Sequence, residues 1–337
     1  MRRSSRLVAI TDEPEAASEV SLKRSHTPPP NEPSEIPRAP SRPSSVSPKK
    51  RKLQDEPLLP LLSPEDVELR TTIKRASLPF SLDKAREHLC AADKRFIPLF
   101  ARYPIKAYAP SDEPLNLYRT IINSILGQQI SWLAAKAIIN KFLRIFDPSL
   151  PEDTSTTDFF PSPLAVLQVE DKRLREAGLS MSKIAYVRDV SRRFADGRFD
   201  VRKIATLSAD ECIDVLTQAK GVGRWTAEMM LMFALRHPDV LPTGDLGVQR
   251  GMVNFFLACN CGEKLKDEAD QQSCSCDGES YVSTGTSLTP TTLSARAKGN
   301  KTSKKMYLDE KEMYSLTEHW VPYRSVGTMF MWRIKSL

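Results

Sequence analysis

From about residue 80 onward, the apolar residues of the chain recur at the spacing of helices rather than strands. One segment has its apolar residues at positions i, i+4, i+5, i+8 and i+9, which form one face of a helix: Leu117, Ile121, Ile122, Ile125 and Leu126. Ser131 precedes a second segment of this kind that reaches Phe146, and two more follow at about 162–177 and 182–196. Because no convincing run alternates apolar with polar residues, we predict an all-α fold.

The N-terminal part of the chain has a different composition. Twelve of the 25 prolines lie in residues 1–64, mixed with Ser, Glu, Lys and Arg. Such a segment buries too little apolar surface to offset the entropy lost on ordering, so we expect residues 1–79 to be a disordered tail. Its basic run PKKRK at 48–52 is typical of a nuclear import signal; the alternative is a solvated charge cluster. We favour import and expect the protein in the nucleus.

A second polar stretch, rich in Ser, Thr, Lys and Gly, interrupts the helical part at about 259–305. A structureless segment of this length normally marks an insertion or a mobile loop, here within a domain that spans 80–337. Four of the six cysteines lie in it, as Cys259-x-Cys261 and Cys274-x-Cys276. Zinc sites more often place two residues between paired cysteines, so we interpret these thiols as part of the loop and not as metal ligands.

The overall charge and the hydropathy limit the class of partner. The formal net charge of +7 favours a polyanionic partner such as nucleic acid. No stretch approaches the roughly 18 consecutive apolar residues that a membrane span needs, and the N-terminus has no apolar run typical of a secretory signal. We therefore expect neither a membrane protein nor a secreted one.

Residues 208–224 predict two helices joined by a tight hairpin. Ser208 and Glu211 have the spacing of a capping box at the start of the first helix, and the second begins near Arg224. Between them lies Gly221-Val222-Gly223, which would bring backbone amides and a helix N-terminus to one exposed corner. Glycine lets a phosphate approach that backbone, and the amides with the helix dipole attract an anion. An ordinary helical hairpin with glycine caps is the alternative.

The sequence around this hairpin closely resembles a known family. LTQAKGVGRWTAEMMLMFALRHPDVLPTGDLGVQRG is similar to the helix-hairpin-helix, Gly/Pro-rich loop and aspartate signature of DNA glycosylases. SILGQQIS upstream and WVPYRSVGTMFMWR near the C-terminus resemble the 3-methyladenine DNA glycosylase branch. The resemblance spans roughly 80–260 and 306–337, and it implies two helical lobes flanking a cleft.

The resemblance also implies an activity. Members of this branch flip alkylated purines out of double-stranded DNA and hydrolyse the N-glycosidic bond, leaving an abasic site for base excision repair. It implies no organic cofactor, downstream enzymes that act on abasic sites, and a monomer. The lesion range stays open among 3-methyladenine, 7-methylguanine, hypoxanthine and ethenoadenine. A bifunctional glycosylase/lyase and a catalytically silent DNA-binding module are the rival interpretations.

Three residues carry the catalytic expectations. Asp245 matches the family's catalytic aspartate, and a carboxylate there would stabilise the positive charge that develops on the sugar. Trp225 stands where bifunctional relatives have the lysine that forms a Schiff base, so the resemblance implies a hydrolase without lyase activity. Trp225 and Met229 match residues at the base pocket. Without the resemblance, Asp245 would be a helix cap and Trp225 a core residue.

The remaining site residues are assigned to DNA contacts. Gln129 matches the wedge that fills the gap left by the flipped nucleotide, and Gln128 lies beside it at the minor groove. The expected phosphate contacts are Lys220, Gly221, Gly223, Arg224 and Lys183. A monovalent cation, Na⁺ or K⁺, would bind the backbone carbonyls of Thr217, Ala219 and Val222 when DNA is present.

Overall fold

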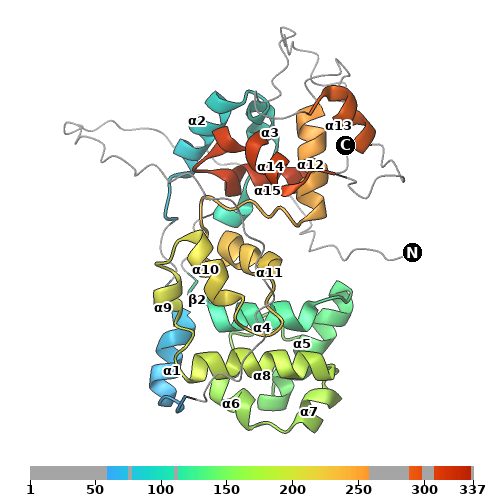
Figure 1. Ribbon diagram of the computed structural model, residues 1–337. Helices are drawn as coiled ribbons and strands as arrows, with labels where there is room; N and C mark the ends of the chain where they lie inside the picture. Colours follow the sequence, from blue (N-terminus) through green and yellow to red (C-terminus); the bar gives the residue numbers. More distant parts are fainter. Residues whose placement is uncertain (1–58, 75–77, 110–112, 258–287, 298–306, 335–337) are drawn as a thin grey trace, which may run out of the picture. The chain divides into compact units, whose positions relative to one another are not determined.

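The computed structural model describes residues 59–74, 78–109, 113–257, 288–297 and 307–334. Those from Leu61 onward belong to one compact unit. Most of them lie in helices, with two short strands (Figure 1), which confirms the predicted all-α class. The basic run at 48–52 and the four clustered cysteines lie outside the described residues. Among the described helices, none combines the length and the apolar character needed to cross a membrane.

The first of two hydrophobic cores, here called the first core, is formed mainly by the middle of the chain. Its elements are α4 (Leu117–Gly127), α5 (Trp132–Phe146), α6 (Pro163–Gln168), α7 (Asp171–Glu176), α8 (Met181–Ala195), α9 (Val201–Ile204), α10 (Ala209–Leu216), α11 (Arg224–Met229) and a π-helical turn, η2 (Met230–Ala234). The predicted apolar face of α4 is buried in this core. The side chains of Asn116 and Ser131 cap α4 and α5, as short polar residues at such positions do.

The second core combines an N-terminal segment with the C-terminal part of the chain. Its elements are α2 (Leu82–Ala92), α3 (Phe96–Arg102), η1 (Lys106–Tyr108), α12 (Leu246–Leu257), α13 (Pro290–Ala297), α14 (Glu310–Leu316), η3 (Glu318–Trp320) and α15 (Arg324–Ile334). Trp320 is fully buried at its centre and stacks on Phe256. Met329 and Trp332 pack against both cores. The two cores correspond to the two predicted lobes, while the cleft between them stays a prediction.

Close packing of α12 against α15 determines where the C-terminal helix presents its side chains (Figure 1). A Cβ built on Gly251 of α12 would lie 2.0 Å from the carbonyl oxygen of Met331, so only glycine allows this approach. The contact holds α15 against the N-terminal half of α12. It thereby brings Trp332, next to Met331, towards the residue that precedes α12.

The structure differs from the predicted domain boundary at residue 80. Helix α1 (Pro64–Thr71) and strand β1 (Thr72–Ile73) lie in the stretch assigned to the tail, and β1 pairs antiparallel with β2 (Leu115–Asn116). Ser63 caps α1, Pro64 suits its first turn, and Val67 is 1% exposed. The prolines that indicated disorder here include one that starts a helix, so the folded part begins before residue 80.

The predicted insertion at 259–305 also contains structure. Helix α13 (Pro290–Ala297) lies within it and packs against α12. The side chain of Leu293 is fully buried in the second core, so this helix belongs to the domain. Leu293 is the one large apolar residue of α13, so the polar composition around it hid the helix.

Candidate active site and DNA-binding surface

Asp245 directly precedes α12, and its carboxylate accepts hydrogen bonds from three different helices. Oδ1 accepts from the backbone N–H of Val248 at 2.9 Å and from the indole Nε1 of Trp332 at 3.0 Å. Oδ2 accepts from Nε1 of Trp225 at 2.9 Å. The contact with Val248 is the usual capping bond, and the two indole bonds are additional. Asp245 is therefore both a helix cap, as its local sequence alone predicts, and the centre of a polar cluster.

This arrangement fixes the carboxylate in a half-buried position while leaving part of its surroundings open. A carboxylate has about four lone-pair sites, so three donors leave it able to accept one further bond or to face a positive charge. Gly244, the preceding residue, has no atom within 4 Å of a Cβ built on it. The space beside Asp245 on that side is not filled by the protein itself.

The indole rings around Asp245 form an aromatic border. Trp225 is 38% exposed although its Nε1 is held by the carboxylate, so a face or an edge of its ring stays accessible. Trp332 stacks on Phe233 with ring centroids 5.8 Å apart, and Phe233 is 41% exposed. Gly247 makes room for this arrangement, because a Cβ there would lie 2.9 Å from the Trp332 ring.

Sequence reasoning brought Asp245 and Trp225 into one site, but it missed Trp332 and Phe233. Trp332 lies 87 residues after Asp245, beyond the reach of any local pattern. Phe233 had no motif to single it out. Met229 was expected to line the base pocket; it is 6% exposed and packs within the first core. Its pocket role stays a prediction.

The two glycines of the hairpin between α10 and α11 are needed for different reasons. Gly221 has a left-handed φ of +82°, and a Cβ on it would lie 2.4 Å from the ring of Tyr186. Gly223 has an ordinary φ of −88°, and nothing lies within 4 Å of a Cβ built on it. The fold therefore requires glycine at 221 but not at 223.

At Gly223 the hairpin presents backbone rather than side chain. Gly223 is the N-cap of α11 and has no side chain to satisfy the amides of the first turn. Those amides therefore depend on a group from outside the helix, and an anion suits them. The local geometry agrees with the predicted phosphate site, whose assignment stays a prediction.

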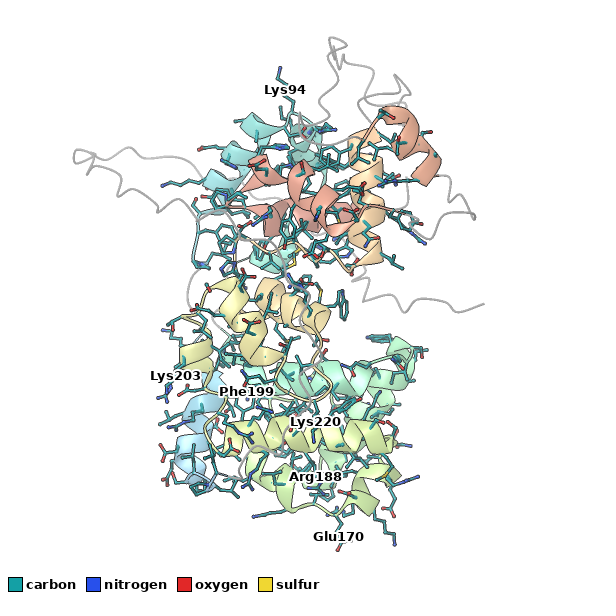
Figure 2. The ribbon with its side chains drawn as sticks, viewed as in Figure 1. Lys94, Glu170, Arg188, Phe199, Lys203 and Lys220 are labelled. Atoms are coloured by element: carbon teal, nitrogen blue, oxygen red, sulfur yellow. The ribbon has the colours of Figure 1, made fainter. Side chains whose placement is uncertain are left out.

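The charged residues of the hairpin are held in different ways. Lys220, labelled in Figure 2, lies at the hairpin with an exposed side chain, while its backbone N–H donates to Asp189 at 2.9 Å. Arg224 forms an ion pair with Glu228, with 2.9 Å between Nε and Oε1. The Arg224 side chain is 45% exposed and that of Glu228 only 2%. Lys220 is thus free to meet a phosphate, and Arg224 would do so while neutralising Glu228.

Burial strongly affects Glu228. It raises the pKa of this carboxyl to about 7, with Arg224 opposing the effect and the carboxylates of Glu310 and Asp245 adding to it. Sequence analysis gave Glu228 no role. A glutamate one helical turn after an arginine normally indicates an exposed ion pair, and nothing in the pattern indicates that the acid is buried.

The joint between α4 and α5 contacts the hairpin directly. Gln128 donates through Nε2 to the carbonyl oxygen of Gly221 at 2.9 Å, so its side chain ties the joint to the hairpin. Gln129 is exposed and has a φ of 60°, a left-handed conformation uncommon for residues other than glycine. Lys183 donates through Nζ to the carbonyl oxygen of Leu126 at 2.6 Å, and burial lowers its pKa.

These contacts distinguish the three residues. Gln129 is exposed at a tight turn, where a wedge residue would lie. Gln128 braces that turn against the hairpin, and Lys183 closes the C-terminal end of α4, where a lysine also suits the helix dipole. The wedge and phosphate roles stay predictions.

The carbonyl groups expected to bind a monovalent cation lie in one short turn. Ala219 already accepts the N–H of Val222 at 3.1 Å, which leaves its oxygen one further lone pair. Thr217 is the C-cap of α10. Neutral oxygens of this kind suit Na⁺ or K⁺. Within the described part of the chain, no group of three or more His, Cys, Asp or Glu side chains could hold a metal ion.

An all-α fold with a glycine hairpin beside a fixed carboxylate is the architecture of helix-hairpin-helix DNA-repair proteins. Residues 122–273, which include the hairpin and Asp245, match the family described as HhH-GPD superfamily base excision DNA repair protein. The region that contains the candidate site is therefore similar to this general class of protein.

Similar proteins define the branch. The chain is 34% identical over 175 residues to DNA-3-methyladenine glycosylase 1 of Schizosaccharomyces pombe, which covers 51% of this chain and 72% of that protein. It is 25% identical over 259 residues to the DNA-3-methyladenine glycosylase of Saccharomyces cerevisiae, covering 75% and 79%. A solved DNA-3-methyladenine glycosidase from Bacillus halodurans matches with a TM-score of 0.50 and 25% identity over 78% of this chain and 92% of that one.

The chain belongs to the HhH-GPD superfamily of base excision DNA repair proteins and, within it, to the DNA-3-methyladenine glycosylases. The predicted family, fold class and enzyme class, a hydrolase acting on N-glycosyl bonds, are therefore confirmed.

Proposed function

We propose that this enzyme excises alkylated purines from double-stranded DNA as a monofunctional glycosylase, without cutting the strand. The names of its relatives support the substrate class. The observation that carries the proposal is the carboxylate of Asp245, held by three N–H donors beside the exposed indole of Trp225. This geometry suits the stabilisation of a positive charge next to an aromatic surface.

Asp245 would act by electrostatics. As the N-glycosidic bond breaks, positive charge develops on the deoxyribose, and a fixed carboxylate lowers the free energy of that transition state. The three donors hold the carboxylate in place before the reaction, so little reorganisation is needed. A purine alkylated at N3 or N7 already carries a positive charge and leaves readily, which explains why the site needs no strong general acid. The same carboxylate can direct the attacking water.

Trp225 would bind the base and exclude the lyase reaction. The face of an indole attracts a cation, and a cationic purine presents its charge over a flat ring. A Schiff base requires an amine at this point, and Trp225 supplies none. The amine of Lys183 is hydrogen-bonded to the carbonyl oxygen of Leu126. The product would be an intact strand with an abasic site.

Base flipping would use the hairpin and the α4–α5 joint together. The scissile bond is inaccessible within stacked DNA, so the nucleotide must leave the helix and the gap must be filled. Gln129 is exposed at the joint, and Gln128 links that joint to the proposed phosphate-binding hairpin through Gly221. Gripping one strand at the hairpin would therefore position the wedge.

The setting of the enzyme follows from its sequence and its product. We propose that the enzyme is nuclear, because the basic run at 48–52 is typical of a nuclear import signal. We also propose that it acts as a monomer, as the family resemblance implies. Enzymes that cut at abasic sites would act on its product. A fluorescent fusion in which this run is replaced by alanines should lose nuclear accumulation; unchanged nuclear accumulation would refute this placement.

The test is release of free bases from methylated duplex DNA by the wild type and by Asp245→Asn. We expect methylated purines to be released without strand cleavage, and the variant to lose at least about 100-fold in rate. Asp171→Asn, which alters an exposed carboxylate paired with Arg188, is the matched control and should keep full activity. DNA binding without base release by the wild type would favour the silent binding module, and immediate strand cleavage would favour a lyase.

A further inference from the structure

The first turn of α5 carries two large apolar side chains that the fold does not use. Trp132 is 53% exposed and Leu133 is 70% exposed. Neither belongs to the first or the second core, and the buried face of α5 begins further along the helix. An exposed indole keeps a large apolar surface in water, where it gains nothing from folding. This pair of residues therefore needs an explanation other than packing.

The position of this turn ties it to the proposed DNA-binding surface. Trp132 follows the exposed Gln129 by three residues, directly after the cap at Ser131. The preceding joint is bonded to the hairpin through Gln128 and Gly221. The exposed indole is thus next to the point where a flipped nucleotide would leave its gap.

The charge around Trp132 suits an anionic partner with aromatic faces. The ammonium group of Lys136 lies 5.7 Å from the centre of the Trp132 ring, and it pairs with Asp153 at 2.7 Å. The ring is also at the N-terminal end of a 15-residue helix, where the helix dipole is positive. The charged group that faces the ring is therefore a cation.

The size of the apolar patch formed by Trp132 and Leu133 indicates that it binds DNA rather than protein. A stable protein interface buries about 800 Å² on each partner, far more than two side chains on one helical turn can supply. A single nucleobase, by contrast, matches one indole, and stacking between them needs no wider apolar surface. The patch fits a base or a base step and not a protein.

We infer that Trp132 is a second DNA-contact residue, whose indole packs against a base exposed beside the gap that Gln129 fills. Leu133 adds an apolar contact at the same place. The inference rests on the proposed function, because it takes flipped DNA as the ligand. Apolar side chains that enter the minor groove commonly wedge against partly unstacked bases, and Trp132 would extend the wedge from the joint to the first residue of α5.

The experiment measures binding to duplex DNA that contains a stable abasic-site analogue, by anisotropy of labelled DNA at several salt concentrations. Trp132→Ala should weaken binding about 5- to 100-fold, and Trp132→Phe should retain most of the affinity. The slope of log Kd against log salt should stay unchanged in both, since no phosphate contact is lost. Leu69→Ala, at a 57% exposed residue on α1, is the control and should bind as the wild type does.

A second readout uses the fluorescence of the protein. The chain has four tryptophans, and the difference between the wild type and Trp132→Phe isolates the signal of this one. Stacking on a base should quench that difference signal when DNA is added. Absence of quenching, or affinity of Trp132→Ala within twofold of the wild type, would overturn the inference even if base release proceeds normally.

Three further outcomes also count against the inference. If the wild type fails to bind the abasic-site duplex, the proposed function fails and this inference falls with it. If light scattering without DNA shows a dimer that Trp132→Ala abolishes, the patch is an interface between copies of the chain. A fall in affinity of Trp132→Ala accompanied by a changed salt slope would mean that the helix end has moved, which also contradicts stacking.

Discussion

Glu228 provides a test of the structure that does not depend on DNA. Its carboxyl group is 2% exposed, with Arg224 on the same helix and the carboxylates of Glu310 and Asp245 as the other charged groups near it. Burial raises its pKa from 4.5 to about 7. The folded protein therefore holds this proton more tightly than the unfolded chain does.

The sign and size of the effect on stability follow from that pKa. The contribution of Glu228 to the stability of the fold is complete below pH 4.5. It is lost as the pH rises through about 7, where the buried carboxyl group must ionise. The difference between the two pKa values, 4.5 and about 7, corresponds to about 3 kcal/mol of unfolding free energy. Glu228→Gln keeps the shape but cannot ionise, so the variant should not lose this stability.

Urea unfolding at pH 5 and at pH 8 measures the effect. The stability of Glu228→Gln relative to the wild type should rise by about 2 to 3 kcal/mol between the two pH values. All other titrating groups are shared, so they cancel in this difference. Glu211→Gln is the control: Ser208 holds the pKa of that exposed carboxyl low, so its difference from the wild type should stay constant over this range.

The same pH dependence in the wild type and Glu228→Gln would refute the reasoning. It would mean that Glu228 is already ionised at pH 5 and that Arg224 fully compensates its burial.

Four other substitutions test the site. Gly223→Ala should keep its melting temperature but bind DNA more weakly, since only an external group needs the open backbone; unchanged affinity would contradict the phosphate site. Gly221→Ala should lower the free energy of unfolding in urea by at least about 2 kcal/mol, because residue 221 has a left-handed φ and the new Cβ would lie 2.4 Å from the ring of Tyr186. Trp332→Phe removes one donor to Asp245 and should slow base release about 10-fold with little effect on melting. Lys220→Ala should lower the slope of log Kd against log salt by about one; an unchanged slope would place Lys220 off the phosphates.

The hairpin and the helices were predictable because their signals are local. Ser208 and Glu211 form the capping box that their spacing predicts, and Asn116 and Ser131 cap α4 and α5. Such bonds join residues within one turn, so the sequence pattern contains both partners. Asp245 and Trp225 also lie within one motif, which is why the resemblance could place them in the same site.

Helices α1 and α13 were not predictable from composition. Both depend on a few buried apolar residues, Val67 and Leu293, set among polar neighbours. Composition averages over a segment, whereas burial of one side chain depends on what the rest of the fold places opposite it. The boundary at residue 80 was wrong for this reason.

The sequence by itself therefore determined the helical class, the hairpin, the family and the aspartate with its neighbouring indole. Only the tertiary structure decided that Trp332 completes the cluster around Asp245, that Glu228 is buried behind Arg224, and that Trp132 is left exposed beside Gln129. The first set depends on contacts between residues near in the chain. The second depends on which helices pack together, as α12 does on α15 through Gly251, and no local pattern records that choice.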